Sequence, residues 1–255
     1  MQAARKLQRR KGRTAARAFL IEGLTLLQDA LDAGADVAEV FIEDCSDRPE
    51  AEELCLAHEL TFYRIDRQVG RVLAQTVTAP GVVAVVRFPD IALADISMEA
   101  DLVLVVAEVR DPGNAGTLVR SAAAAGAGAV IFSTRAVDPL APKTVRSGAG
   151  AIFRIPLVLE AELEGATAFL RRRGFVVAAA DAHAGLIPER CDMTRPMAFV
   201  VGNEARGLPE GIEGSVDEVI GIPMPGSAES LNVGVAGSIL LFEAVRQRRA
   251  SSQAR

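Results

Sequence analysis

This sequence of 255 residues has no tryptophan and a single tyrosine, Tyr63. Stacking many bases on aromatic side chains is a common way to hold single-stranded nucleic acid, and this composition argues against that binding mode. Histidine occurs twice and cysteine three times, with no C-x-x-C pair. Such a supply argues against a metal site and for a reducing compartment. The spacing of Cys45 and Cys55 leaves a disulfide as the alternative.

The sequence also lacks a long apolar run. No stretch reaches the ~20 apolar residues of a membrane span, and the N-terminus has no apolar segment of the kind that secretory signals contain. Hydrophobic residues make up 50% and charged residues 24% of the chain, which is ordinary for a globular protein. We therefore expect a cytoplasmic protein with one large domain or two modest ones.

The net charge of −5 hides an uneven distribution of charge. The two ends of the chain are basic and carry no acidic residue, with Arg5, Lys6, Arg9, Arg10, Lys11, Arg13 and Arg17 at one end and Arg246, Arg248, Arg249 and Arg255 at the other. The remaining chain has 17 basic against 33 acidic residues. Basic ends on an acidic body indicate a polyanion that is bound at one place. A solvated, frayed terminus is the alternative.

The first ninety residues are expected to form a small α/β unit. Apolar residues at helical spacing predict a helix over 15–33 that ends at Gly34. The elements predicted next are a strand over 38–44, a helix over 48–60, a strand over 61–66, a short helix, and a strand over 81–88. The stretch 89–101 contains proline and has no clear period, so the domain boundary is expected there.

Apolar strands alternate with helices in the rest of the chain. Strands are predicted over 102–109, 129–133, 153–159, 175–181, 197–203 and 218–224, and helices over 115–126, 139–147, 161–173 and 231–248. This alternation favours a mostly parallel sheet that is covered by helices on both faces. In such sheets ligands bind beyond the carboxyl ends of the strands. The loops after the strands are therefore the candidate site.

The first unusual loop is DPGNAGTLVR, residues 111–120. Asn114 is a residue type that caps helix N-termini, and glycines on either side of it allow a close approach to the backbone. Gly116 and Arg120 are four residues apart and so share a helix face. An arginine there can hold a phosphate or carboxylate through a fork of hydrogen bonds. An ordinary exposed arginine behind a capping asparagine is the alternative.

Two further loops follow buried strands. In VVGNEARGLP, residues 200–209, two glycines bracket Asn203, Glu204 and Arg206. The segment IGIPMPGSAESLNVGVAGSILLFEAV, residues 220–245, has prolines that stiffen the backbone after a strand. Ser230 and Asn232 then stand at the start of the last helix, where small residues allow tight packing. A plain N-cap role is the alternative for Ser230.

Taken jointly, the motifs N-x-G-x-x-x-R, G-N-E-x-x-G-L and I-P-M-x-G-x-x-x-S-L-N-V resemble the SpoU (TrmH-like) family of RNA 2′-O-ribose methyltransferases. The segments RKGRTAARAFLIEG near the N-terminus and DPLAPKTVRSGAGAIFRIPL at 138–157 are also similar to family members. The resemblance implies an L30-like RNA substrate-binding domain with a basic arm over 1–89 and a linker over 90–100. A SPOUT methyltransferase domain with a C-terminal trefoil knot would occupy 101–255.

The resemblance implies transfer of a methyl group from S-adenosylmethionine to a ribose 2′-hydroxyl of structured RNA, by a homodimer formed through the C-terminal domain, without a metal. The implied catalytic residues are Arg120, Asn114, Glu204, Ser230 and Asn232. The implied cofactor contacts are Gly202, Asn203, Ile222, Met224 and Leu231. RNA contacts are expected from the basic arm at Arg5, Arg9, Arg10, Lys11, Arg13 and Arg17. A guanidinium stays protonated, so we expect Arg120 to hold a phosphate and stabilise the developing alkoxide rather than act as a base.

One position departs from the family pattern, because Gly234 stands where a serine is common. The expected target is ribosomal RNA, since simpler tRNA-modifying members tend to lack the L30-like domain. A transfer RNA, a ribosomal site whose methylation confers antibiotic resistance, and an inactive RNA-binding relative are the alternatives. A nicotinamide-dependent enzyme is disfavoured because the sequence has no G-x-G-x-x-G motif after a strand.

Overall fold

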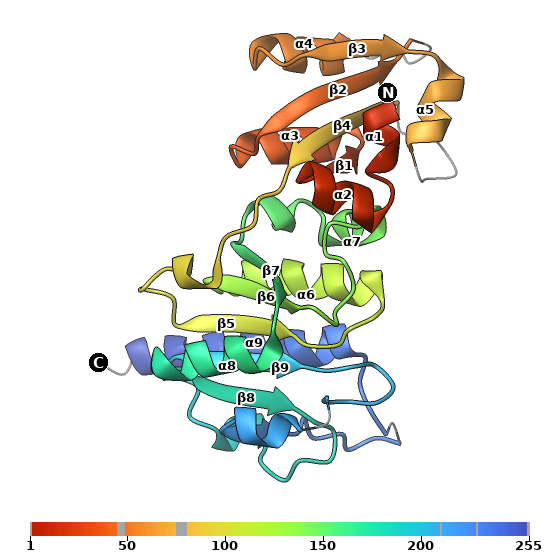
Figure 1. Cartoon of the computed structure of the whole chain (residues 1–255). Coiled ribbons are helices and arrows are strands. Elements are labelled where there is room, and N and C mark those ends of the chain that lie inside the picture. The colour runs from red at the N-terminus through yellow and green to blue at the C-terminus, as the bar shows by residue number, and fades with distance from the viewer. Residues whose placement is uncertain (1, 45–48, 75–80, 210, 228, 254–255) are drawn as a thin grey trace. The chain divides into compact units, whose positions relative to one another are not determined.

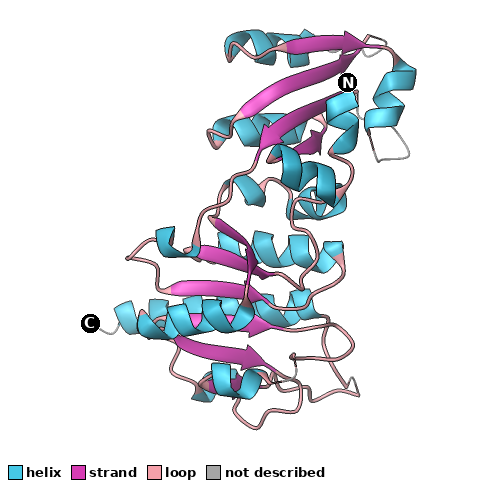
Figure 2. Cartoon of the chain, viewed as in Figure 1, coloured by secondary structure: helices cyan, strands magenta, loops and turns pink. Residues whose placement is uncertain are grey.

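The structure is a computed structural model that describes residues 2–44, 49–74, 81–209, 211–227 and 229–253. The chain forms two compact units. The first comprises Met1–Pro89 and Leu140–Arg154, and the second comprises Asp90–Pro139 and Ile155–Arg255. Figure 1 follows the chain through both units, and Figure 2 shows that each is built from strands and helices.

A mixed four-stranded sheet forms the centre of the first unit. Its strand order is β1 (Ala18–Glu22), β4 (Val82–Arg87), β2 (Val37–Glu43) and β3 (Phe62–Ile65). Strands β1 and β2 run antiparallel to β4, and β3 runs parallel to β2. The helices along this part of the chain are α3 (Leu24–Asp32), α4 (Pro49–Ala57) and α5 (Arg67–Leu73).

The prediction of a continuous helix over 15–33 is wrong. Residues Ala18–Glu22 form strand β1, in which every side chain is buried, and helix α3 begins only after Gly23. Arg17 has a left-handed φ of 50° and Gly23 a φ of 96°, so the backbone turns at both ends of the strand. A short run that is apolar on both faces fits a buried strand as well as a helix, and pairing with β4 decides between them here.

The basic N-terminus is folded rather than frayed. It forms α1 (Gln2–Lys6) and α2 (Arg10–Ala16), with Ala4 and Leu7 buried. The Arg13 side chain is only 4% exposed, and its Nη1 donates to the carbonyl of Leu7 at 2.8 Å. Arg13 therefore holds the two helices together, which corrects the expectation that it contacts RNA.

Residues 140–154 belong to the first unit, although they lie far along the sequence from its other residues. Helix α7 (Pro142–Gly148) packs against β1. Arg146 forms an ion pair of 3.3 Å with the buried carboxylate of Glu22, and the Phe153 ring stacks on Phe19 at 6.1 Å between centroids. The chain therefore returns to the first unit after two strands of the second have formed.

The second unit contains a six-stranded sheet in which all neighbouring strands are parallel. Its order is β10 (Glu218–Ile220), β8 (Val176–Ala180), β9 (Met197–Val201), β5 (Leu102–Val106), β6 (Ala129–Ser133) and β7 (Leu157–Ala161). The predicted α/β class with a mostly parallel sheet is confirmed. The trefoil knot stays a prediction.

Helices α6 (Pro112–Ala124), α8 (Leu163–Arg172) and α9 (Val233–Gln253) cover this sheet. On β9, Val200 belongs to a core cluster with α8, whereas Val201 faces α9 at Gly237. Successive strand residues point to opposite faces, so α8 and α9 lie on opposite sides of the sheet. A Cβ at Gly237 would stand 2.5 Å from a methyl carbon of Leu118 on α6, so α6 and α9 touch where the sequence predicted tight packing.

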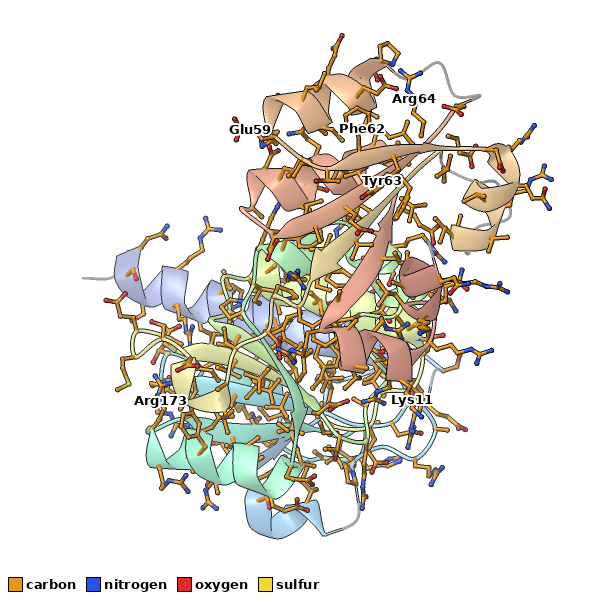
Figure 3. The ribbon with its side chains drawn as sticks, turned by 45° about the horizontal axis from the view of Figure 1, so that its top comes forward. Lys11, Glu59, Phe62, Tyr63, Arg64 and Arg173 are labelled. Carbon is orange, nitrogen blue, oxygen red and sulfur yellow. The ribbon has the colours of Figure 1, made fainter. Side chains whose placement is uncertain are left out.

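Residues 90–100, expected to be a linker, pack against the second unit. Asp90 bridges to Leu157, and Leu93–Asp95 forms a 3-10 turn. Arg173, labelled in Figure 3, donates to the carbonyls of Ile96 and Ser97 at 2.8 and 2.6 Å. These contacts give the segment a fixed position on the sheet domain.

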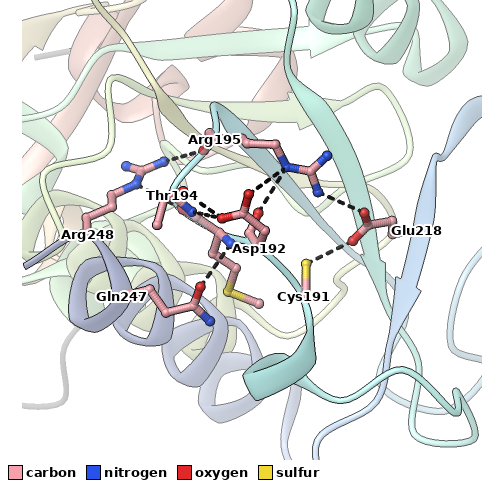
Figure 4. Close-up of polar contacts among 8 residues, drawn as sticks. Cys191, Asp192, Thr194, Arg195, Glu218, Gln247 and Arg248 are labelled. Carbon is pink, nitrogen blue, oxygen red and sulfur yellow. Dashed lines mark hydrogen bonds and ion pairs between the residues drawn. The ribbon is translucent and has the colours of Figure 1, made fainter. Parts of the chain in front are cut away.

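A polar cluster ties the edge strand β10 to its neighbours (Figure 4). The Cys191 thiol donates to Glu218 at 2.8 Å, and Arg195 donates to the other oxygen of the same carboxylate at 3.0 Å. Burial, followed by the hydrogen bond to Glu218 and its negative charge, raises the pKa of Cys191 to about 12, which keeps the thiol protonated as a donor. Cys55 is buried and free, whereas Cys45 lies outside the described residues. No helix in the described ranges is long and apolar enough to cross a membrane.

Candidate active site

A cavity of about 360 Å³ lies beyond the carboxyl ends of β8, β9 and β10. Its volume falls within the range of small-molecule sites, ~300–1,000 Å³. The residues expected to contact the cofactor, which are Gly202, Asn203, Ile222, Met224 and Leu231, all line it, together with Glu204 and Ser230. Two of the three loops singled out in the sequence therefore form the walls of one cavity.

The loop after β9 is a tight turn that depends on Gly202. The backbone N–H of Asn203 donates to the carbonyl of Gly207 at 2.6 Å, and the Gly207 N–H donates back at 2.9 Å. A Cβ at Gly202 would stand 2.1 Å from that same Gly207 oxygen. The sequence predicted that Gly202 opens the backbone to a ligand, but the space beside it is filled by the loop's own chain.

The side chain of Asn203 stabilises this turn through hydrogen bonds to the turn's own backbone. Its Oδ1 accepts from the backbone N–H groups of Ala205 and Arg206 at 3.0 and 3.1 Å. Its Nδ2 donates to the carbonyl of Glu108, just beyond β5, at 3.1 Å. The side chain therefore joins the ends of two neighbouring strands, and it serves the loop's conformation at least as directly as a ligand.

Three of the expected catalytic residues form one chain of hydrogen bonds. Asn232 at the start of α9 donates from Nδ2 to Oδ1 of Asn114 on α6, at 2.8 Å. Asn114 donates from its own Nδ2 to Oε1 of Glu204 at 3.0 Å. The same carboxylate accepts from the backbone N–H groups of Arg110 and Asp111, at 3.1 and 2.9 Å for the shorter contacts. All three loops thus meet at Glu204 and Asn114.

Asn114 is free to make these bonds because it does not cap its helix. Helix α6 begins at Pro112, and the side chain of Asp111 accepts from the Asn114 N–H at 3.0 Å. The prediction of Asn114 as the N-cap is therefore wrong by three residues, because Asp111 is the cap. Aspartate followed by proline was the available signal, because proline is common at the first position of a helix.

The hydrogen bonds around Glu204 stabilise its charged form. Partial burial by itself would raise the pKa of Glu204, but hydrogen bonds from the Asn114 side chain and from backbone N–H groups outweigh it and lower the pKa. The carboxylate therefore stays ionised at neutral pH. With its oxygens held by several donors, Glu204 is suited to orienting α6 rather than to accepting a proton.

Asn232 has a second role at the start of α9. Its Oδ1 accepts from the backbone N–H of Gly234 at 2.9 Å and caps the helix. A Cβ at Gly234 would lie 3.1 Å from that oxygen and 3.3 Å from Cγ2 of Thr117. Glycine at this position, where the resembling family commonly has serine, thus leaves room for the Asn232 side chain. Ser230 is not the cap and lines the cavity instead.

Arg120 stands apart from this chain of hydrogen bonds. It lies six residues beyond Asn114 on α6, its side chain is exposed, and it is not among the residues that line the cavity. Within the part of the chain that the structure describes, Arg120 makes no hydrogen bond or ion pair. A cation that is exposed and uncommitted in this way is available to an external anion.

The cavity also contains residues that the sequence did not indicate. Asp181 and His183, just after β8, line it, as does Glu229 before the last helix. The His183 N–H donates to the Asp181 carboxylate at 2.7 Å, which fixes this turn. The signal was present, because Asp181 follows a predicted strand at the edge of a parallel sheet where ligands gather. Asp181 belongs to no recognisable motif, however, so the sequence does not distinguish it from an ordinary turn residue.

The charges in the cavity favour a cationic ligand. Among the described residues that line it, Asp181, Glu204 and Glu229 are acidic and Arg206 carries the one guanidinium. Aliphatic side chains such as Ile222, Met224 and Leu231 supply apolar wall. S-adenosylmethionine combines an apolar base and chain with a sulfonium and an ammonium group, and it fits these walls better than a triphosphate does. Among the described residues, no group of three or more His, Cys, Asp or Glu could hold a metal.

The cavity at the carboxyl edge of the parallel sheet suits S-adenosylmethionine, and comparison with known proteins gives the class, which is an RNA methyltransferase. Residues 101–242 match the SpoU rRNA methylase family, and residues 1–84 match the MRM3-like substrate-binding domain. The chain therefore belongs to the SpoU rRNA methylase family.

Similar proteins cover almost the whole chain. The 23S rRNA (guanosine(2553)-2′-O)-methyltransferase RlmP of Bacillus subtilis is 32% identical over 93% of this chain and 92% of its own. The structure of the SpoU methyltransferase AviRb from Streptomyces viridochromogenes in complex with S-adenosylmethionine matches with a TM-score of 0.90 and 30% identity, covering 98% of this chain and 97% of that one. An S-adenosylmethionine-bound rRNA methyltransferase from Sinorhizobium meliloti matches with a TM-score of 0.85 and 30% identity, covering 96% and 93%.

These matches confirm several predictions made from the sequence. The SpoU family, the fold class, the class of S-adenosylmethionine-dependent RNA methyltransferase and the cofactor are as expected. Roles of individual residues in catalysis, in cofactor contact and in RNA contact stay predictions.

The close approach at Gly202 generates a prediction about cofactor affinity. Gly202→Ala places a Cβ against the Gly207 carbonyl, so the turn that forms one wall of the cavity must shift. We expect the affinity for S-adenosylmethionine, measured by isothermal titration calorimetry, to fall more than about tenfold, which corresponds to ~1.4 kcal/mol. Gly214→Ala is the matched control, since nothing lies within 4 Å of a Cβ there. Equal affinities of both variants would contradict this account of the loop.

Proposed function

We propose that this enzyme methylates the 2′-oxygen of a ribose in ribosomal RNA. The observation that carries the proposal is the meeting of the three motif loops, in which Asn114, Glu204 and Asn232 are joined by hydrogen bonds at the rim of a cavity suited to S-adenosylmethionine. The proposal is supported by RlmP of Bacillus subtilis, which is named as a 23S rRNA 2′-O-methyltransferase and matches over 93% of this chain, and by the structural match to the SpoU methyltransferase AviRb. A ribosomal RNA substrate implies a cytoplasmic location.

The first domain is proposed to bind the RNA. Its match to a substrate-binding domain supports this role, and its N-terminal helices present basic residues. Of the expected contacts, Arg5, Arg9, Arg10, Lys11 and Arg17 are exposed, and they remain the proposed contacts. The guanidinium of Arg17 also lies 4.7 Å from the centroid of the Phe88 ring, which restricts its reach.

The residues of the second domain divide the catalytic work. When bound, S-adenosylmethionine supplies a methyl group on a sulfonium that becomes a neutral thioether after transfer. The backbone and aliphatic groups of the cavity hold it, and the carboxylates offset its positive charge. The hydrogen-bonded chain from Asn232 to Glu204 fixes the start of α6 beside the cavity, so that a ribose held there keeps one orientation toward the methyl group.

Arg120 is proposed to hold the RNA at the reacting ribose. Its guanidinium is exposed and uncommitted, and it remains protonated at any physiological pH. It can therefore grip a phosphate and stabilise negative charge on the 2′-oxygen as that oxygen attacks. It is not suited to removing the proton.

A homodimer through the second domain is also proposed. Helix α9 exposes Val235, Ile239 and Phe242, at 46%, 37% and 47% of their surface. These residues are four and three positions apart and therefore lie on one face of the helix. Contiguous exposed apolar side chains mark interaction surfaces, and a second copy of the chain offers the same stripe for self-complementary packing.

The RNA target is testable by mapping. We expect 2′-O-methyl sites in total RNA from cells with and without this gene to differ at one position of ribosomal RNA. A change confined to transfer RNA would instead support the alternative substrate, and no change in either would point to an inactive RNA-binding protein. Recombinant protein that restores the missing methyl group in vitro, with S-adenosylmethionine as the only added cofactor, completes the test.

Substitution of Arg120 separates its proposed role from a structural one. Arg120→Ala should lower single-turnover methylation by about 10²–10³-fold, the usual effect of removing one transition-state donor. Arg120→Lys keeps the charge but not the planar fork, so it should be impaired as well. Cofactor affinity and melting temperature should stay near those of the unmodified protein.

The control for Arg120 is Arg172→Ala, which removes an exposed arginine from helix α8. An exposed arginine without a special role changes stability by only about ±0.5 kcal/mol when substituted and leaves turnover alone. Near-normal turnover in Arg120→Ala would end the proposed role of this residue. A fall in melting temperature that parallels the loss of cofactor affinity would assign it to the fold instead.

The dimer predicts a change in sedimentation. Phe242→Glu places a charge in the apolar stripe of α9, and we expect analytical ultracentrifugation to show monomers where the unmodified protein forms dimers, because burial of an unpaired charge is costly. Met98→Glu is the control, since Met98 is 84% exposed and lies away from α9 in the sequence. Dimers that persist in Phe242→Glu would rule out this stripe as the interface.

A further inference from the structure

Acidic and basic residues of the first domain are segregated along its sequence. Residues 1–17 contain seven basic residues and residues 67–89 contain three, and neither segment contains an acidic one. The intervening residues 18–66 contain thirteen acidic residues and two basic ones. Forty-nine residues therefore separate the two basic segments, and only the fold can bring them together.

Helix α1 packs directly against α5, which carries two of the three basic residues of the second segment. The Gln8 side chain, just after α1, donates from Nε2 to the carbonyls of Val72 and Leu73 at 2.6 and 3.1 Å. Ala4 and Leu7 share a buried cluster with Leu73. Figure 1 shows α1 between α2 and α5, and in Figure 3 Lys11 marks α2 on the same side of the domain.

Six cations along these helices are exposed and make no ion pair within the described part of the chain. We name as the basic face the six side chains Arg5, Lys6, Arg9, Lys11, Arg67 and Arg71. Each is exposed, and none makes an ion pair or side-chain hydrogen bond with a residue that the structure describes. By contrast, Arg64 on β3, labelled in Figure 3, pairs with Glu52 at 2.7 Å, and Arg87 on β4 pairs with Asp36 at 3.4 Å.

The positive charges of Arg67 and Arg71 also lie close enough on α5 to repel each other. They are four residues apart on α5, so their side chains lie on one face with Cβ atoms about 5–6 Å apart. Like charges at this spacing destabilise a helix. Two acidic residues contact α5, and both are engaged or buried: Asp66 caps α5 through the Val69 N–H, and Glu43 lies buried beneath Gly70. An external anion between the two arginines would remove the repulsion.

We infer that α5 completes a phosphate-binding surface that the sequence assigned to the N-terminal arm alone. Arg67 and Arg71 would contact the backbone of structured RNA, with α1 and α2 extending the same surface. Phosphate is favoured over an acidic protein segment, because arginine forks match phosphate oxygens and the domain matches substrate-binding domains of this RNA-modifying family. The inference rests on the proposed function for the identity of the RNA.

The test measures binding of protein-free ribosomal RNA by filter retention over a range of potassium chloride concentrations. Affinity falls as salt rises, and each lost phosphate contact reduces the magnitude of the slope of log affinity against log salt by about 0.7–0.9. For Arg67→Gln/Arg71→Gln we expect a slope that is smaller by about 1.4–1.8. Arg67→Lys/Arg71→Lys retains both charges and should keep the slope of the unmodified protein. A slope that changed because substitution at these positions disturbs folding would change in the lysine variant as well.

A control with the same loss of charge is Arg64→Gln/Arg87→Gln, whose arginines are already paired with carboxylates. Its slope should equal that of the unmodified protein. An unchanged slope in Arg67→Gln/Arg71→Gln overturns the inference, and so does an equal fall in the control, which would reflect net charge alone. Poly-glutamate that competes as well as the RNA would identify an acidic protein as the partner and also overturn it.

The proposed function is judged separately with the same preparations. If the unmodified protein binds S-adenosylmethionine and methylates a ribose of ribosomal RNA, the proposed function stands whatever the slopes show. If it binds ribosomal RNA with the expected slopes but transfers no methyl group to it, the basic face stands and the proposed function fails.

Discussion

The carboxylate of Glu204 is the group on which the geometry of the candidate active site depends. It receives hydrogen bonds from the side chain of Asn114 and from the backbone of residues 110–111, and Asn114 in turn receives one from Asn232. Three loops that are up to 118 residues apart in sequence thus share one set of donors and acceptors. Because hydrogen bonds to an ionised group are stronger than those between neutral groups, this arrangement holds the starts of α6 and α9 in place.

Close packing at two glycines supports the same arrangement of loops and helices. Gly237 lets α9 approach Leu118 of α6 and Val201 of β9, so that both helices lie against the strand that leads into the Glu204 loop. Gly202 lets that loop close on its own backbone. Neither glycine needs an unusual φ for its role. At both positions a side chain would occupy space that another segment of the same chain fills. The absence of a side chain at these two glycines therefore helps to set the shape of the cavity.

Charge is divided between the two domains according to their proposed tasks. The cavity of the second domain is lined by three carboxylates and one arginine, which suits a cationic cofactor. In the first domain the six cations of the basic face lie on or beside α1, α2 and α5, whereas the acidic residues lie in the segment 18–66 between them in sequence. A protein with a net charge of −5 can therefore bind RNA, since a phosphate backbone responds to the local field and not to the total charge.

The sequence by itself determined the family, the fold class and the three loops that the structure brings together, because motif spacing and apolar periodicity are local properties of the chain. It misjudged β1, since a short run that is apolar on both faces becomes a strand only when β4 pairs with it. It misjudged Arg13 and the cap of α6, since burial and capping depend on which neighbour accepts or donates. Only the tertiary structure joined α1 to α5, and only it separated Arg120 from the hydrogen bonds of Asn114, because side chains distant in sequence meet through packing that no local pattern records.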